Sequence, residues 1–226
     1  MFLQIYRNKQ RWLFSCLFIF IYGCNNSPAY TNLIVTPAEV NAGKIKNEKA
    51  FLAIGHAMKN LQQGDLVMRT GNDFTSEMLQ QLCLTDKTYS HCGIVVIEND
   101  SAFVYHALGG DWNPDEKLRR DPFDLFCNPY ENRGFGIFRF DFQSKEKNRL
   151  DSVSRDWYKK GLQFDMKFDL TTNDRLYCAE FITKAVEIAT NRRITFSTTS
   201  IKGFQYEAPD NLFLNQHVTE KIRIRF

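Results

Sequence analysis

The chain has 226 residues, of which 43% are hydrophobic and 14% aromatic, enough to bury the core of one globular domain. Its formal charge of +3 comes from Arg7, Lys9 and Arg11, and the rest of the chain carries equal numbers of basic and acidic residues. A balanced body offers no basic surface of the kind that nucleic acids bind, so the composition argues against nucleic-acid partners.

The first 35 residues have the features of a targeting segment. The three cations precede an apolar run, residues 12–22, that is short for a membrane span and has the length of a signal-peptide core. Residues 21–24, Ile-Tyr-Gly-Cys, resemble a bacterial lipoprotein signal. The resemblance implies a signal peptide over residues 1–23, a lipid on Cys24 and a polar tether over residues 24–35, which would anchor the protein in the bacterial envelope. An uncleaved N-terminal membrane helix is the alternative.

Residues 36–226 are predicted to form one α+β domain, with helices packed on a mainly antiparallel sheet or small barrel. Thr36-Pro37-Ala38-Glu39 has the form of a capping box and predicts a helix over 37–61. A strand at 66–69 and a helix at 74–83, with Met78 directed inward, come next. β-Forming runs on either side of residues 98–101 then predict a hairpin, followed by a strand at 134–142.

The last third of the chain is predicted to contain two helices and a strand. A helix over 145–160 ends at Gly161, and a second begins with Asp174 as its N-cap and runs to Ala189. Residues 191–209 carry no regular pattern, and residues 217–226 alternate as a final strand.

Four cysteines follow Cys24. Cys83, Cys92 and Cys127 are interpreted as small buried hydrophobes, with two disulfides as the alternative for an exported protein. Their spacing matches no metal-binding pattern, and no segment indicates an organic cofactor. We therefore expect no cofactor.

Cys178 is the fourth, and it lies in the first turn of a predicted helix. Unpaired backbone N–H groups and the helix dipole favour a thiolate there. A nucleophilic cysteine needs a base and a group that orients the base, and His91 and His106 face each other across the predicted hairpin. The alternative is structural: a buried cysteine on a helix face and a histidine at a strand start.

Four segments in this order resemble the circularly permuted branch of the NlpC-type papain-like cysteine amidases and peptidases. They are Gly64-Asp-Leu-Val67, Ser90-His-Cys-Gly-Ile94, Tyr105-His-Ala107 and Tyr177-Cys-Ala-Glu180. The order carries the resemblance, because the histidine strands precede the cysteine helix.

The resemblance implies roles for three residues: Cys178 as nucleophile, His91 as general base and acid, and His106 as the orienting residue, where many permuted members have a glutamate. Phe164 stands where the family often has a tyrosine. The implied activity is hydrolysis of an amide bond, in a peptidoglycan-type peptide or another small amide, through an acyl-enzyme. A lipid esterase or acyltransferase with the same residues, and a non-catalytic binding module, are the alternatives.

One charged cluster leaves two interpretations open. Arg119 and Arg120 beside Asp121 are expected either to contact an anionic group of a substrate or to form an ordinary solvated cluster.

Overall fold

The computed structural model describes residues 36–110 and 113–226, so the predicted signal, Cys24 and the tether lie outside the described residues. Residues 41–226 form one compact unit, which contains every described strand. The helices are α1 (Pro37–Met58), α2 (Phe74–Gln80), α3 (Phe123–Phe126), α4 (Ser144–Lys160), α5 (Cys178–Ala189) and α6 (Pro209–Phe213). The strands are β1 (Leu66–Gly71), β2 (His91–Glu98), β3 (Ser101–His106), β4 (Arg119–Pro122), β5 (Asn132–Phe140), β6 (Thr199–Ile201), β7 (Phe204–Tyr206) and β8 (Val218–Arg225).

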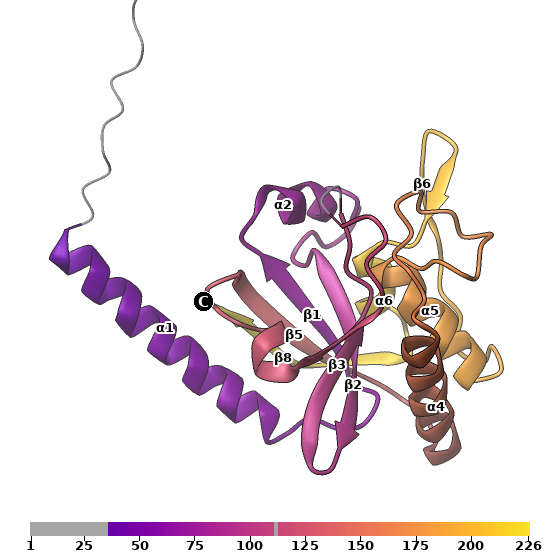
Figure 1. The fold of residues 1–226 in the computed structure, drawn as a ribbon, viewed down its shortest axis with the longest axis horizontal. Coiled ribbons are helices and arrows are strands. Elements are labelled where there is room, and N and C mark those ends of the chain that lie inside the picture. The colour runs from indigo at the N-terminus through magenta and orange to yellow at the C-terminus, as the bar shows by residue number, and fades with distance from the viewer. Residues whose placement is uncertain (1–35, 111–112) are drawn as a thin grey trace, which may run out of the picture. The chain divides into compact units, whose positions relative to one another are not determined.

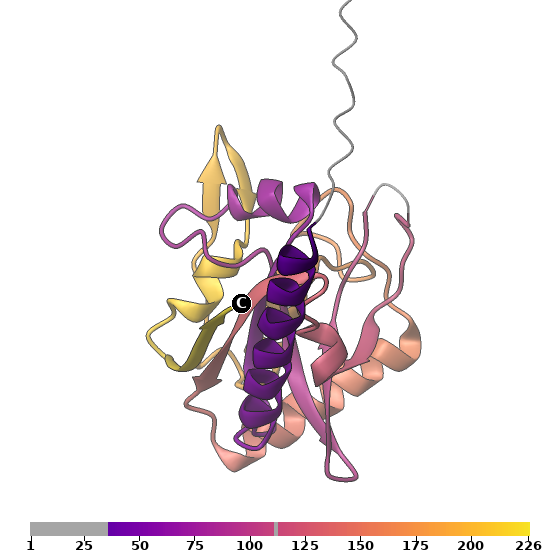
Figure 2. The same ribbon diagram turned by 90° about the vertical axis from the view of Figure 1, so that its left-hand side faces the viewer.

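Six strands form one antiparallel sheet in the order β4-β3-β2-β1-β5-β8. This confirms a helix-and-sheet protein with a mainly antiparallel sheet. The outer strands β4 and β8 do not pair with each other, so the sheet is open, and the expectation of a small barrel was wrong. β6 and β7 form a separate hairpin that projects beyond the sheet (Figures 1 and 2).

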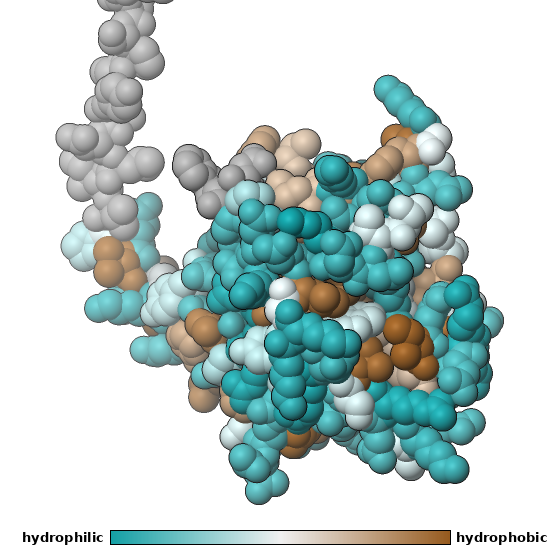
Figure 3. Space-filling view, turned by 45° about the vertical axis from the view of Figure 1, so that its right-hand side comes forward, coloured by the Kyte–Doolittle hydropathy of each residue, from teal (hydrophilic) through white to brown (hydrophobic). Residues whose placement is uncertain are grey.

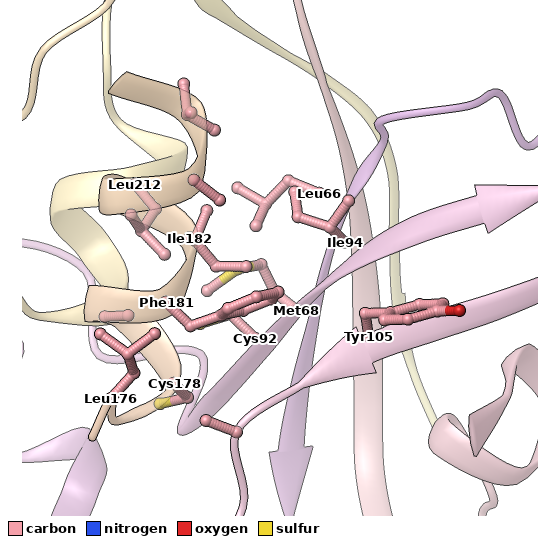
Figure 4. Close-up of a cluster of buried hydrophobic side chains, with 14 of the residues drawn as sticks. Leu66, Met68, Cys92, Ile94, Tyr105, Leu176, Cys178, Phe181, Ile182 and Leu212 are labelled. Carbon is pink, nitrogen blue, oxygen red and sulfur yellow. The ribbon is translucent and has the colours of Figure 1, made fainter. Parts of the chain in front are cut away.

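Successive strand residues face opposite sides of the sheet and divide the core in two. On one side α5 packs on residues of β1 and β2, among them Met68, Cys92 and Ile94 (Figure 4). α4 and α5 lie along this side of the sheet in Figure 1. The other side is covered by Ile54 and Ala57 of α1 and by Phe123 and Phe126 of α3, which pack on Val67, Val95, Val104, Phe135 and Ile137.

Several local predictions are confirmed. The capping box of α1 is formed, since the backbone N–H of Thr36 donates to Glu39 Oε2 over 2.7 Å and that of Glu39 to Thr36 Oγ1 over 3.3 Å. Gly161 ends α4 in the left-handed conformation at φ 66°. The hairpin is present, with Asn99 and Asp100 at positive φ in its tight turn.

Other predictions need correction. α2 ends at Gln80 and buries none of its residues, and Met78 is 55% exposed instead of directed inward. The irregular segment after residue 191 contains the β6–β7 hairpin and α6. α5 begins at Cys178 with Tyr177 as its N-cap, three residues after the predicted N-cap Asp174. The shift arises because Gln163 bridges to Arg175 and holds the preceding backbone extended.

Within residues 36–110 and 113–226, no helix combines the length and the apolar composition needed to cross a bilayer. On the face drawn in Figure 3, hydrophobic residues appear as separate patches between hydrophilic ones.

Candidate active site

His91 and His106 meet across the hairpin. His91 is the first residue of β2 and His106 the last of β3, and Nε2 of His91 lies 2.8 Å from Nδ1 of His106. Gly93 makes room for this contact, since a Cβ there would lie 2.4 Å from Val104 Cγ1 and 3.1 Å from His106 Cβ. The ring of Phe126 covers both imidazoles, with centroids 5.6 Å and 5.0 Å away. The structure therefore brings the two predicted histidines into direct contact.

A third group, Asp121 on β4, determines which ring nitrogens of the two histidines carry a hydrogen. Its Oδ2 lies 3.0 Å from Nε2 of His106. An ionised carboxylate only accepts hydrogen bonds, so Nε2 of His106 carries the proton and Nδ1 of His106 accepts from Nε2–H of His91. Nδ1 of His91 is then the unprotonated nitrogen, and no described residue hydrogen-bonds to it. That nitrogen is the basic atom of the set.

Burial and charge both keep the imidazoles neutral. Burial, the Arg69 guanidinium, His106 and Arg119 lower the pKa of His91 well below its ordinary value. Burial also lowers the pKa of His106, to about 4, although the hydrogen bond to Asp121 acts in the opposite direction. Burial by itself would raise the pKa of Asp121, but the contacts with His106 and Arg119 lower this pKa below its ordinary value. A neutral imidazole is the form that can take a proton from a thiol.

Cys178 is the first residue of α5, and its side chain is 9% exposed (Figure 4). The thiol of Cys92 is the main cause of a lowered Cys178 pKa, which burial opposes. The backbone N–H groups of Ala179, Cys92 and Cys178 lower the same pKa further, as expected at a helix N-terminus. Cys178 is thus the described cysteine whose surroundings favour a thiolate.

The other three described cysteines are buried and free. Burial raises the pKa of Cys83 to about 12 and raises the pKa values of Cys92 and Cys127 as well. Their interpretation as small buried residues is confirmed.

Cys178 packs on the side of β2 that carries Cys92, whereas His91 packs on the side that carries Phe126. The backbone N–H of Cys92 is among the groups that lower the Cys178 pKa. In the described residues no hydrogen bond joins Cys178 to either imidazole. The side chain of Cys92 faces α5, whereas that of its neighbour His91 packs on Phe126 on the opposite side of the strand. Proton transfer from Cys178 to His91 therefore requires a rearrangement that brings the two side chains into hydrogen-bond reach.

Phe164 is buried and has no hydroxyl group, so it supplies no hydrogen bond to a substrate. It packs beneath the loop that follows β3, where a Cβ at Gly109 would lie 2.4 Å from Phe164 Cγ. The hydroxyl of Tyr177, the residue before Cys178, accepts from the backbone N–H of Glu207 over 2.6 Å. Both aromatic side chains hold the walls of the site in place.

Two residues at the site were not identified from the sequence. Asp121 lies on a short, polar outer strand that has no alternating pattern, so its pairing with β3 was not predicted. Arg120 of the same cluster pairs with Glu98 at 2.5 Å, and Arg119 with Asp121 at 3.1 Å. Arg69 is the second missed residue, and the available signal was a cation within the apolar strand Leu66-Val-Met-Arg.

Comparisons with known proteins give a fold but no activity. No protein-family model matches the chain. It is 23% identical over 150 residues to the uncharacterized protein YiiX of Escherichia coli K12, covering 66% of this chain and 68% of YiiX. A crystal structure of YiiX from E. coli O157:H7, described as a metalloprotein with the domain DUF1105, superposes with a TM-score of 0.61 at 17% identity. That match covers 73% of this chain and 98% of the YiiX chain.

Proposed function

We propose that the chain is a thiol hydrolase of the bacterial cell envelope that cleaves an amide bond in a peptidoglycan-type peptide or another small amide. One observation carries the proposal: the hydrogen bonds from Asp121 through His106 to His91 leave Nδ1 of His91 as a proton acceptor. The contact between the two imidazoles supports the roles that the resemblance gives His91 and His106, and the resemblance alone assigns Cys178 as the nucleophile. A lipid on Cys24 would hold the domain at the membrane.

In the first half of the reaction, Nδ1 of His91 takes the proton of Cys178, and the thiolate attacks the carbonyl carbon of the amide. Backbone N–H groups at the start of α5 are positioned to donate to the oxyanion that forms. When the intermediate collapses, the C–N bond breaks, and Nδ1–H of His91 donates its proton to the leaving amine. The acyl group remains on the sulfur as a thioester.

In the second half, His91 takes a proton from water while the water oxygen attacks the thioester. The C–S bond breaks, the carboxylic acid leaves, and the proton returns to the thiolate. Throughout both halves His106 and Asp121 keep Nε2 of His91 protonated, so the same nitrogen, Nδ1, exchanges the proton each time.

The description of the YiiX structure as a metalloprotein raises the question of a metal here. His91, His106 and Asp121 are the candidate ligands, but they form a row in which both nitrogens of His106 are engaged in hydrogen bonds. The part of the chain that the structure describes contains no group of three or more His, Cys, Asp or Glu side chains arranged to hold an ion. These residues do not fit a metal site, and the proposed reaction uses none.

The test is product release by the purified protein from muropeptides and from short-chain esters, with Cys178→Ala as the inactive reference. The proposal expects amine release from the amide, lost in Cys178→Ala. Faster turnover of the esters would favour the lipid esterase or acyltransferase. Binding without turnover of either substrate would favour a binding module and contradict the proposal.

A further inference from the structure

The place of β4 in the sheet decides whether Asp121 reaches His106. β4 has four residues, lies at the outer edge of the sheet and pairs with β3 alone. Asp121 lies opposite Val104, so its contact with His106 is diagonal, two residues further along β3. A slip of β4 by one residue would turn Asp121 to the opposite side of the sheet. The hydrogen bond to His106 therefore depends on the register of a short outer strand.

Arg120 connects β4 to β2 across β3. Its side chain passes over the ring of Phe103, with the guanidinium carbon 3.4 Å from the ring centroid. It then forms a forked contact with Glu98, in which Nη2 donates to Oε2 over 2.5 Å and Nε to both carboxylate oxygens over 3.1 Å. We call Arg120 and Glu98 the β4 clamp. It lies on the side of the sheet that α5 covers, opposite to the side on which Asp121 meets His106.

Two other groups fix Glu98 in the clamp. The hydroxyl of Tyr105 donates to Glu98 Oε1 over 2.7 Å, and Nη1 of Arg155 on α4 lies 3.1 Å from the same oxygen. The contacts with Arg120, Tyr105 and Arg155 lower the pKa of Glu98 although burial opposes them, which keeps the carboxylate ionised. An isolated surface ion pair contributes little, but a forked pair within a network holds one geometry. The clamp therefore joins the outer strand to β2 and, through Arg155, to α4.

Hydrophobic packing holds β4 at its two ends. Leu118, just before the strand, is 4% exposed, and Phe123, just after it, is completely buried. The strand residues between them, including Asp121, are partly or fully exposed. Loss of the clamp should therefore leave β4 attached at its ends while its centre opens locally.

We infer that Arg120 is a positioning residue, which holds β4 in the register that brings the Asp121 carboxylate to His106. Its importance for the reaction rests on the proposed function. A contact with a substrate anion is not needed to explain the place of Arg120, because Glu98 already accepts its hydrogen bonds.

The inference is tested on the proton that Nε2 of His106 donates to Asp121. In full-length protein carrying isotope-labelled histidine, NMR in water near neutral pH detects this N–H while the hydrogen bond protects it from exchange. The resonance should be present in the unmodified protein and lost in Asp121→Ala. Arg120→Met keeps an apolar side chain over Phe103 without the guanidinium, and it should lose the resonance as well. The ring signals of His217, which contacts Asp141, should not change.

The steady-state rate gives a second readout. If Arg120 acts through Asp121, Arg120→Met should lower kcat/KM by no more than Asp121→Ala does. The double variant should then match Asp121→Ala within about twofold, because the residue through which Arg120 acts is already absent.

Two further variants separate positioning from folding. Glu98→Gln removes the carboxylate of the clamp and should also lose the His106 resonance, which keeps the inference testable if Arg120→Met does not fold. Arg223→Met is the matched control and should keep the resonance. Arg223 also lies on an outer strand, β8, with Asp86 and Glu220 at 3.1 Å and 2.9 Å and the ring of Tyr89 at 5.5 Å.

The inference is overturned if the His106 resonance is absent from the unmodified protein, survives in both Arg120→Met and Glu98→Gln, or is lost equally in Arg223→Met. Losses of kcat/KM that multiply in the double variant would also overturn it, since Arg120 and Asp121 would then act independently. A resonance that survives in clamp variants of an active protein rejects the inference and keeps the proposed function. A clamp-dependent resonance in a protein that hydrolyses no amide keeps the positioning of Asp121 by Arg120 and rejects the proposed function.

Discussion

Nε2 of His106 donates to Oδ2 of Asp121 over 3.0 Å, and this bond joins the last residue of β3 to an outer strand. A permuted papain-like site with histidine in the orienting position has no carboxylate of its own there. In this chain Asp121 provides a carboxylate beside His106, the residue that we propose orients His91. It can stabilise the positive charge that reaches the histidine pair during proton transfer.

Asp121→Asn should lower kcat/KM by about 10- to 100-fold, the loss expected when a hydrogen bond to a charged group is removed. The carboxylate raises the pKa of His106 against burial, so its loss makes an imidazolium less favourable. The acidic limb of the pH–rate profile should therefore move to lower pH. Steady-state rates across pH measure both effects.

Asp141→Asn is the matched control for that variant, because Asp141 also contacts a histidine, His217 at 2.9 Å, and an arginine, Arg193 at 3.1 Å. It should retain full activity. Equal losses of kcat/KM in Asp121→Asn and Asp141→Asn would indicate general destabilisation and would contradict a specific role of Asp121 in the reaction.

His106→Glu tests whether Asp121 has taken over the role of the family glutamate. A second carboxylate next to Asp121 introduces like-charge repulsion, so this single variant should be less active than His106→Gln. Combining His106→Glu with Asp121→Asn removes the repulsion and should restore part of the lost rate. If His106→Glu alone exceeds the activity of the unmodified protein, the assignment of Asp121 is wrong.

Gly93→Ala should destabilise the protein by about 1–3 kcal/mol, the usual effect of overpacking. The added methyl would lie 2.4 Å from Val104 Cγ1 and push His106 away from His91. Gly55→Ala is the control, because nothing lies within 4 Å of its Cβ position and alanine favours a helix. Urea unfolding of both variants gives the comparison, and equal stabilities would show that the hairpin tolerates a side chain at position 93.

Glu207 provides a test of stability against pH. Burial raises its pKa to about 7, from 4.5 for an exposed carboxyl group. The folded protein therefore holds a proton that the unfolded chain has released, and the stability this provides is complete below about pH 4.5 and lost as pH rises through about 7. Glutamine does not titrate, so Glu207→Gln should lose less stability than the unmodified protein as pH rises. The difference in free energy of unfolding, variant minus unmodified protein, should therefore increase from pH 4.5 to pH 8.

Glu48→Gln, at an exposed site on α1, is the control for that comparison. Its free energy of unfolding should follow the unmodified protein across the same range. A Glu207→Gln curve parallel to that of Glu48→Gln would contradict the raised pKa of Glu207.

Local signals in the sequence were sufficient for much of the fold. The capping box at Thr36, the C-cap at Gly161 and the β-forming runs around residues 98–101 act over a few residues, and each gave the correct element. Position 78 was misassigned because an apolar residue on a short helix does not reveal which side of the helix meets the core.

The candidate site depended on contacts between distant segments. His91 and His106 were paired correctly because both lie on one hairpin, whose register follows from its turn. The contact of Asp121 with His106 was missed because β4 is a polar strand without a hydrophobic pattern. Only its backbone pairing with β3 shows that it belongs to the sheet. The start of α5 was placed too early because Asp174 is a good N-cap, but the bridge from Gln163 to Arg175 keeps that segment extended.

The central claim, that Cys178 is a nucleophile activated by His91, is tested most directly by the rate at which iodoacetamide alkylates each cysteine at pH 7, measured by peptide mass spectrometry. Cys83, Cys92 and Cys127 have raised pKa values and should remain unmodified in the folded protein, whereas Cys178 has a lowered pKa. We predict selective alkylation of Cys178, slowed in His91→Ala and unchanged in His56→Ala. Alkylation of Cys92 or Cys83 in preference to Cys178, or a Cys178 rate that does not respond to His91→Ala, would contradict the claim.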